Sequence, residues 1–160
     1  ILRFFNVAGA DPSGRAGYKV TKNPTHLIRT AIQVALGNKE KLYVYGTDYE
    51  TSDGTCVRDY IHVSDIAQAH IAALAYLRTD GTSNIFNCGY DHGYSVKEVV
   101  NTVQKISGNE FEVEYAPRRA GDPAALTANA DKIKKMLGWQ PQFDNIETII
   151  KTELNWVKSQ

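Results

Sequence analysis

Three arginines in two separate segments have the chemistry to bind a diphosphate. Arg58 lies in one segment, and Arg118 and Arg119 precede Asp122 in a charged loop. A guanidinium binds a phosphate through paired hydrogen bonds, and guanidiniums from separate loops suit the several oxygens of a diphosphate. The alternative is a surface ion-pair network, which contributes little energy. On spacing alone, a solvated pair of Arg58 and Asp59 at a strand end is the simpler interpretation.

The segment from Gly54 to Asp65, which carries Arg58, is predicted to contain a loop, a short strand and the start of a helix. Four of its residues favour extended structure, namely Val57, Tyr60, Ile61 and Val63. Ser64 or Asp65 can cap the apolar-periodic helix that follows. Arg58 would then lie where the loop becomes the strand. His70 falls on the apolar stripe of that helix, which predicts a histidine packed in the core.

The rest of the chain alternates between strand and helix patterns. Strands are predicted over 1–6, 42–45, 84–89 and 111–115, and 7–14 reads as a loop. Helices are predicted to begin at Asn23-Pro24, after Ser64, at the capping box Ser95-x-x-Glu98, at Asp131 and at the cap Asp144-x-x-Glu147. We see no repeat or linker, so the sequence predicts one mixed α/β domain over 1–160.

Composition excludes several classes of partner. The chain has 160 residues, and its 18 basic and 18 acidic residues balance, so no basic field favours nucleic acid. No apolar run approaches the roughly 20 residues of a membrane span. Cys56 and Cys88 have no clustered ligands, which argues against a metal site and favours free thiols in the cytoplasm. Tyr18-x-x-x-Lys22 matches a dehydrogenase spacing but lies in a predicted loop, and no glycine fingerprint for a dinucleotide is visible.

The first segment of the chain has the composition of a buried strand. It opens on Ile1 with apolar residues and no cap, so we expect a piece of a longer protein. Asn6 is predicted to end this strand, and α/β proteins bind ligands just beyond the carboxyl ends of their strands. An Asn6 side chain bonded to its own loop backbone is an equally good interpretation.

Five motifs, taken in order, resemble one enzyme family. They are Arg3-Phe4-Phe5-Asn6-Val7-Ala8-Gly9-Ala10, Thr25-His26-Leu27-Ile28, Tyr45-Gly46-Thr47-Asp48-Tyr49, Asp53-Gly54-Thr55-Cys56-Val57-Arg58-Asp59-Tyr60-Ile61-His62-Val63 and Ala116-Pro117-Arg118-Arg119-Ala120-Gly121-Asp122-Pro123. The set closely resembles the C-terminal half of the UDP-glucose 4-epimerases, which are extended short-chain dehydrogenases/reductases. The resemblance covers essentially all 160 residues.

The resemblance implies a Rossmann-type enzyme whose N-terminal half this chain lacks. The intact enzyme would be a homodimer that holds NAD and interconverts UDP-glucose and UDP-galactose by oxidation and re-reduction at C4. Its catalytic residues would lie in the other half, so we expect this chain alone to be inactive and to bind no NAD. Residues 1–10 and about 57–90 are expected to pack on the Rossmann domain.

The resemblance also assigns the substrate side to this chain. It places Asn6, Leu27, Tyr43 and Tyr45 around the uridine and ribose, and Arg58, Arg119 and Asp122 around the diphosphate and ribose. It places Phe4 and Phe5 near the nicotinamide. No metal ligand is implied.

Two positions depart from the family's usual pattern. His26 stands near the diphosphate where the family commonly has Asn, which keeps a donor but makes the contact pH-sensitive. Leu126 stands where many members have Tyr, so N-acetylated sugars are harder to exclude. Two alternatives stay open: a free-standing, non-catalytic module that binds a UDP-sugar or another partner, and a fragment of a related UDP-sugar decarboxylase or dehydratase.

Overall fold

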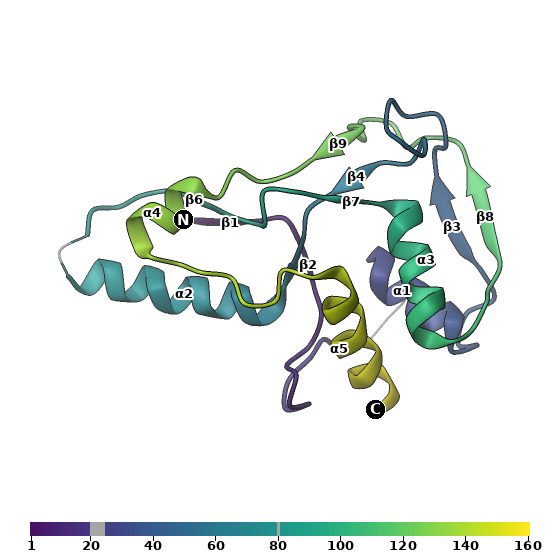
Figure 1. The fold of residues 1–160 in the computed structure, drawn as a ribbon, viewed down its shortest axis with the longest axis horizontal. Helices are drawn as coiled ribbons and strands as arrows, with labels where there is room; N and C mark the ends of the chain where they lie inside the picture. Colours follow the sequence, from purple (N-terminus) through teal and green to yellow (C-terminus); the bar gives the residue numbers. More distant parts are fainter. Residues whose placement is uncertain (20–24, 80) are drawn as a thin grey trace.

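The computed structural model describes residues 1–19, 25–79 and 81–160, which form a mixed α/β fold of short strands flanked by helices (Figure 1). The predicted helix start at Asn23-Pro24 and Lys22 of the dehydrogenase-like spacing lie outside the described residues. The strands are β1 (Leu2–Phe4), β2 (Asn6–Ala8), β3 (Leu42–Tyr45), β4 (Val57–Arg58), β5 (Tyr60–His62), β6 (Phe86–Cys88), β7 (Tyr94–Ser95), β8 (Val113–Ala116) and β9 (Ala125–Leu126). The helices are α1 (Leu27–Ala35), α2 (Val63–Arg78), α3 (Val96–Ser107), α4 (Asp131–Leu137) and α5 (Ile146–Lys158).

The strands pair in small, mostly parallel sets. β1 pairs with β6, β2 with β5 and β3 with β8, all parallel, whereas β4 lies between antiparallel β7 and parallel β9. Figure 1 shows α2 and α4 beside β1 and β6 at one end of an elongated molecule, and α1 and α3 beside β3 and β8 at the other. The β2–β5 pair and β4 therefore lie in the middle, where both ends contribute residues.

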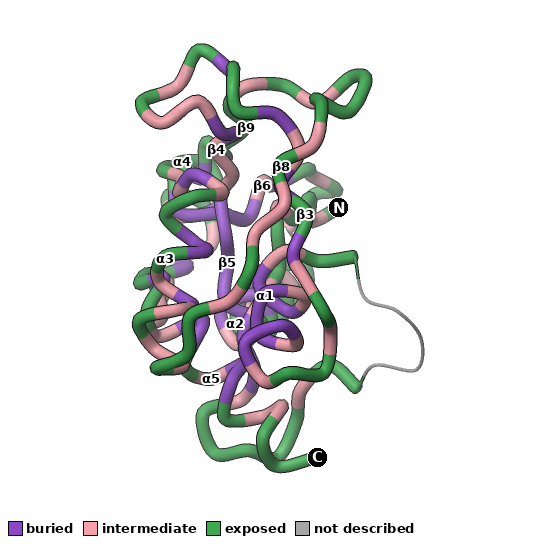
Figure 2. Tube along the Cα trace, turned by 90° about the vertical axis from the view of Figure 1, so that its right-hand side faces the viewer, coloured by how far each residue is buried: buried purple, intermediate pink, exposed green. Residues whose placement is uncertain are grey.

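The main core lies between α1, α3 and α5. Their inward faces carry fully buried aliphatic side chains, among them Ile32, Val99, Val103, Ile149 and Ile150, and Figure 2 shows the buried positions gathered along these helices and β5. The predicted capping box of α3 is confirmed, since the Ser95 hydroxyl accepts from the Glu98 N–H and the Glu98 carboxylate accepts from the Ser95 N–H. The predicted bounds of β3 and the predicted start of α4 at Asp131 are confirmed as well.

The first predicted strand is wrong in two respects. It is broken at Phe5, so Asn6 begins β2 instead of ending a strand, and Val7 and Ala8 are strand residues and not loop. The reason is non-local, because β2 pairs with β5 in a register that sets Asn6 opposite Tyr60. The first strand is also not buried in this chain, since Phe4 is 44% exposed.

Helix α2 differs from its prediction in two respects, its N-cap residue and the burial of its apolar face. His62, and not Ser64 or Asp65, is its N-cap, and the His62 Nδ1 accepts from the Ser64 N–H at 3.1 Å. The predicted core position of His70 is wrong, because its side chain is exposed and its Nδ1 bonds the Ile66 carbonyl. Apolar side chains that share this exposure are Ile71, Leu74 and Leu77. Among the described residues, the Phe4 ring lies 5.4 Å from the His70 ring, and the rest of this face stays exposed.

The final helix begins with a different cap from the one predicted. Asn145 is the N-cap of α5 and accepts from the Thr148 N–H at 2.9 Å. Asp144 instead contacts the His92 Nε2 at 2.7 Å. Among the helices of the described residues, none is both long enough and apolar enough to cross a membrane.

Candidate functional site

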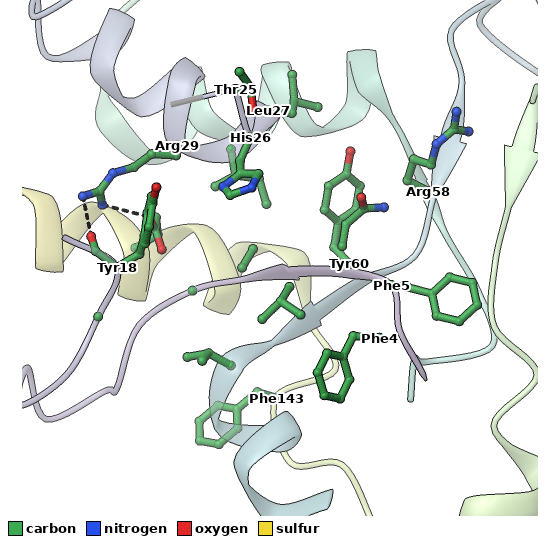
Figure 3. Close-up of a pocket in the computed structure, with 18 of the residues that line it drawn as sticks. Phe4, Phe5, Tyr18, Thr25, His26, Leu27, Arg29, Arg58, Tyr60 and Phe143 are labelled. Atoms are coloured by element: carbon green, nitrogen blue, oxygen red, sulfur yellow. Dashed lines mark hydrogen bonds and ion pairs between the residues drawn. The ribbon is translucent and has the colours of Figure 1, made fainter. Parts of the chain in front are cut away.

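A cavity of about 1420 Å³ opens in the middle of the molecule, between β2, the start of α1, β3 and the β4–β5 segment (Figure 3). Ten of the site residues expected from sequence line this cavity, and Leu126 does not. The ten are Phe4, Phe5, Asn6, His26, Leu27, Tyr43, Tyr45, Arg58, Arg119 and Asp122. Leu126 lies on β9 directly opposite Arg58 in the strand pairing and is half exposed. The structure thus brings together residues that are more than 100 positions apart in the sequence.

Strand alternation decides which side chains of the β4–β5 segment reach the cavity. Successive residues of a strand point to opposite faces, and Cys56, Arg58 and Tyr60 all line the cavity. Asp59 and Ile61, which alternate with Arg58 and Tyr60, face the interior and are fully buried. The segment therefore presents a thiol, a guanidinium and a phenol to one space.

Arg58 is held at the cavity wall by its own surroundings. Its Nη1 donates to the carbonyls of Val57 and Pro123 at 2.8 and 2.9 Å, and its Nη2 lies 3.7 Å from an Asp122 carboxylate oxygen. The Arg58 side chain is only 14% exposed. The solvated pair of Arg58 with Asp59 is therefore wrong, because the carboxylate that faces Arg58 is Asp122, from the second charged segment.

The consecutive arginines Arg118 and Arg119 have different contacts. Arg118 is tied to Asp48, with 2.7 Å from its Nε to a carboxylate oxygen, and stacks on Tyr49. The Arg119 guanidinium lies over the Tyr45 ring at 4.0 Å and has no hydrogen bond or ion pair with any described residue. Of these two arginines, only Arg119 lines the cavity. Of this pair, Arg119 is the one that both lines the cavity and keeps its whole guanidinium available to a ligand.

Asp59 holds the β4–β5 segment in place from the side of the segment that faces away from the cavity. The sequence analysis did not predict this role. Its carboxylate accepts from the N–H of Tyr90 at 3.0 Å and from the N–H of Ala128 at 3.1 Å. Burial raises the pKa of Asp59, although these N–H groups act in the opposite direction. Its backbone carbonyl accepts from the Asn6 N–H at 3.0 Å. Asp59 therefore fixes the bend between Arg58 and Tyr60.

A buried ion pair closes the opposite side of the cavity. Arg29 Nη1 lies 2.8 Å from a Glu153 carboxylate oxygen, both side chains are 5% exposed, and Arg29 Nη2 donates to the Tyr18 carbonyl at 2.7 Å (Figure 3). Burial raises the pKa of Glu153, and Arg29 opposes that shift. Sequence reasoning missed this pair. The available signal was that Glu153 falls on the same helix face as the buried Ile149 and Ile150.

His26 lies at the start of α1 and points into the cavity in Figure 3. It is the N-cap residue, but its side chain makes no capping hydrogen bond. Its ring lies 5.8 Å from the Tyr18 ring. The first backbone N–H groups of a helix attract anions, so an anionic ligand here would meet His26 and the helix end from one side and Arg58 from the other.

The chemistry of the site is that of binding and orienting an anion. Among residues 1–19, 25–79 and 81–160, no group of His, Cys, Asp and Glu could hold a metal ion. The guanidiniums of Arg58 and Arg119, the imidazole of His26 and several aromatic rings line a single space instead. This arrangement suits a ligand with a diphosphate and a flat ring.

The fold and this site define a member of a nucleotide-sugar enzyme family. The chain belongs to the GDP-mannose 4,6 dehydratase family, whose sequence model matches residues 2–152. Within that family it is similar to UDP-glucose 4-epimerases, as the ordered motifs predicted. It is 52% identical to the UDP-glucose 4-epimerase of Azospirillum brasilense over 159 residues, which are 99% of this chain and 45% of the relative. The chain thus spans about half the length of the curated relatives it matches, which fits the predicted likeness to one half.

Solved structures of epimerases show the same fold. A UDP-glucose 4-epimerase crystal structure matches with a TM-score of 0.96 and 49% identity over 100% of this chain and 48% of its own. The UDP-Glc/GlcNAc 4-epimerase from Campylobacter jejuni matches with a TM-score of 0.82 and 50% identity over 100% and 48%. The enzyme from Bifidobacterium longum, solved with NAD⁺ and UDP, matches with a TM-score of 0.89 and 39% identity over 99% and 47%.

Proposed function

We propose that this chain is the UDP-sugar-binding portion of an NAD-dependent UDP-glucose 4-epimerase. The observation that carries the proposal is the convergence of Arg58, Arg119 and Asp122 on one cavity, in a chain similar to epimerases along its whole length. The fit is chemical as well, since two guanidiniums from separate segments match the charge of a diphosphate. The similar B. longum enzyme was solved with NAD⁺ and UDP.

In this proposal the cavity binds the nucleotide at its diphosphate and at its uracil ring, and so fixes its orientation. Arg58 and Arg119 hold the diphosphate, and Asp122, 3.7 Å from Arg58, is available to accept from a ribose hydroxyl. Tyr45 and Leu27 supply apolar surface for the uracil ring, with Asn6 and Tyr43 beside them. The Arg119 guanidinium, which stacks on Tyr45, moves onto the phosphate when the ligand binds.

NAD would be held mainly by the parent protein's other half. This chain's residues fit a supporting part only, because Phe4 and Phe5 offer apolar rings at the cavity edge while no glycine-rich phosphate loop is visible in the sequence. When bound, NAD supplies the hydride chemistry at C4. We propose no catalytic group in this chain; its residues bind and orient the sugar nucleotide.

We propose further that residues 1–10 and about 57–90 pack on the dinucleotide-binding half. The exposed apolar side chains of Phe4, Ile71, Leu74 and Leu77 support this, because contiguous exposed apolar surface marks an interaction site. A homodimeric parent and a cytoplasmic location belong to the same proposal. The location is supported by the two free, buried cysteines.

The test of the proposed function is calorimetric binding of UDP-glucose. We expect Arg119→Gln to weaken binding about 10- to 100-fold, because a hydrogen bond to a charged group is worth about 1.5–3 kcal/mol. The neighbouring Arg118→Gln is the matched control, since Arg118 is tied to Asp48 outside the cavity. Its effect should be less than about 3-fold. A protein that does not bind UDP-glucose, or equal losses in both variants, would refute the proposal.

Sugar tolerance follows from Leu126. We expect the parent enzyme to turn over UDP-N-acetylglucosamine as well as UDP-glucose, because a leucine beside Arg58 leaves more room than a tyrosine. The similar C. jejuni enzyme is named for both sugars. Leu126→Tyr should lower the turnover of the N-acetylated sugar about 10-fold more than that of UDP-glucose. Brisk turnover of UDP-glucose beside negligible turnover of UDP-N-acetylglucosamine would contradict the prediction.

A further inference from the structure

The cavity wall carries a thiol that the proposed function does not use. Cys56 lines the cavity two residues before Arg58, about 7 Å along the backbone, and is 6% exposed. Its place is fixed, because the Cys56 carbonyl accepts from the Val96 N–H at 3.0 Å. Both cysteines of the chain are free. The Cys56 thiol is therefore available to a reagent that enters the cavity.

A second polar group lies beside this thiol and has no partner of its own. Tyr49 is 5% exposed, and its hydroxyl has no hydrogen-bond partner among the described residues. Burial raises the pKa of Tyr49, and the neighbouring Cys56 and Asp122 act in the same direction. Buried polar side chains nearly always have hydrogen-bond partners. A protonated, unpaired phenol next to a thiol therefore points to an acceptor that the thiol can acquire.

The Tyr49 ring is held in this place by its surroundings. The Arg118 guanidinium lies over the ring at 4.2 Å, and a methyl group added at Gly46 would clash with the ring. The Tyr49 N–H donates to the Gly54 carbonyl at 2.9 Å. Because the ring is confined on these sides, its hydroxyl stays beside Cys56.

Cys88 shows the contrast within the same chain. It is fully buried, it does not line the cavity, and burial raises the pKa of its thiol to about 11. The thiolate is the reactive form of cysteine, and reactive cysteines lie in electropositive, accessible surroundings. Cys56 shares its cavity with the guanidiniums of Arg58 and Arg119. The two thiols should therefore differ in reactivity, with Cys88 as the inert one.

We propose that Cys56 is an oxidation site in the cavity wall, at which a peroxide converts the thiol to a sulfenic acid whose new oxygen accepts a hydrogen bond from the Tyr49 hydroxyl. An S–O bond forms as the peroxide O–O bond breaks, and the thiol proton leaves with the departing hydroxide as water. Sulfur loses two electrons, and the peroxide gains them. The new oxygen also competes with a diphosphate for the Arg58 guanidinium. This effect on binding rests on the proposed function, whereas the oxidation does not.

Treatment of the whole chain with hydrogen peroxide tests the oxidation site. Dimedone traps sulfenic acids, and mass spectrometry of the tryptic peptides 42–58 and 79–97 reports Cys56 and Cys88 separately. We expect Cys56 to be trapped at least about 10-fold faster than Cys88 in the folded protein, and urea to remove the difference. UDP-glucose at about ten times its Kd should slow the trapping of Cys56 about 10-fold, because the bound nucleotide covers the thiol.

Two variants test the role of Tyr49 and the effect on binding. Tyr49→Phe keeps the ring under Arg118 and should slow the trapping of Cys56 about 10-fold, since a hydrogen bond to the developing charge is lost. Tyr115→Phe, on exposed β8 outside the cavity, is the matched control and should leave the rate unchanged. Oxidised wild type should bind UDP-glucose about 10-fold more weakly and recover with dithiothreitol. Peroxide should not change the affinity of Cys56→Ala.

Each other outcome has a distinct meaning. Equal trapping of Cys56 and Cys88 in the folded protein overturns the oxidation site and leaves the proposed function standing. Trapping of Tyr49→Phe at the wild-type rate overturns the role of the Tyr49 hydroxyl. An unchanged affinity for UDP-glucose after oxidation of Cys56 overturns the competition for Arg58. Failure of the reduced wild type to bind UDP-glucose refutes the proposed function itself, and the trapping rates still decide the oxidation site.

Discussion

Replacing Arg29 with methionine is expected to lower the free energy of unfolding by about 3–5 kcal/mol, the usual cost of removing one partner of a buried ion pair. The Glu153 carboxylate would be left 95% buried without its guanidinium, since its side chain is only 5% exposed. The variant would also lose the bond from Arg29 to the Tyr18 carbonyl, which ties down a segment lining the cavity. Urea unfolding at pH 7 measures the loss.

The loss should depend on pH in a defined direction. Burial raises the pKa of Glu153 even in the wild type, where Arg29 opposes the shift. A carboxyl whose folded-state pKa is raised stabilises the fold below its unfolded pKa, and this stabilisation is lost as the pH rises through the folded value. Without Arg29 the pKa rises further. The variant should therefore be less handicapped at pH 5 than at pH 7.

Two further variants separate the buried pair from ordinary surface charge. Arg29→Met with Glu153→Leu should recover most of the lost stability, because an apolar pair of similar volume removes the unpaired charge. Lys105→Met breaks an exposed pair with Glu147 and should change the free energy of unfolding by less than about 1 kcal/mol. A loss for Arg29→Met no larger than that for Lys105→Met, with no pH dependence, would contradict this account.

Local signals in the sequence were sufficient for elements that are stabilised locally. The capping box at Ser95 and the left-handed Gly108 bound α3 by contacts within one or two turns, and both are legible in sequence. The strand Leu42–Tyr45 and the helix that begins at Asp131 were predicted for the same reason. The convergence of the site residues was implied by family resemblance, since nothing local connects Arg58 with Arg119.

The failures share a physical cause, which is that the deciding partner is remote in the chain. Periodicity identified the apolar stripe of α2 but could not tell whether anything covers it, so His70 was wrongly placed in the core. Strand β2 was missed beyond Asn6 because its partner β5 lies more than 50 residues away. Asp59 was taken for a solvated charge because its N–H donors come from Tyr90 and Ala128.

Asp59 illustrates how such a remote contact serves the site. Its carboxylate is fully buried and accepts from the backbone N–H groups of Tyr90 and Ala128. The fit is tight, because a methyl group added at Gly89 would lie 2.5 Å from a carboxylate oxygen of Asp59. The residues on either side of Asp59 both point into the cavity. The stability of the bend at Asp59 and the orientation of Arg58 and Tyr60 toward the cavity therefore both depend on the Asp59 side chain.

Asp59→Ala is accordingly expected to lower the free energy of unfolding by about 3 kcal/mol, since two buried N–H groups lose their acceptor at about 1–3 kcal/mol each. It should also weaken UDP-glucose binding about 10-fold or more, because Arg58 and Tyr60 lose their fixed direction. Asp59→Asn keeps one acceptor oxygen and should cost less on both measures. Glu110→Ala, which removes an exposed carboxylate, is the control and should change neither. Urea unfolding and calorimetry on the three variants decide the matter: if Asp59→Ala resembles Glu110→Ala, the bend is held by its strand pairing with β9 and β2 and the carboxylate is dispensable.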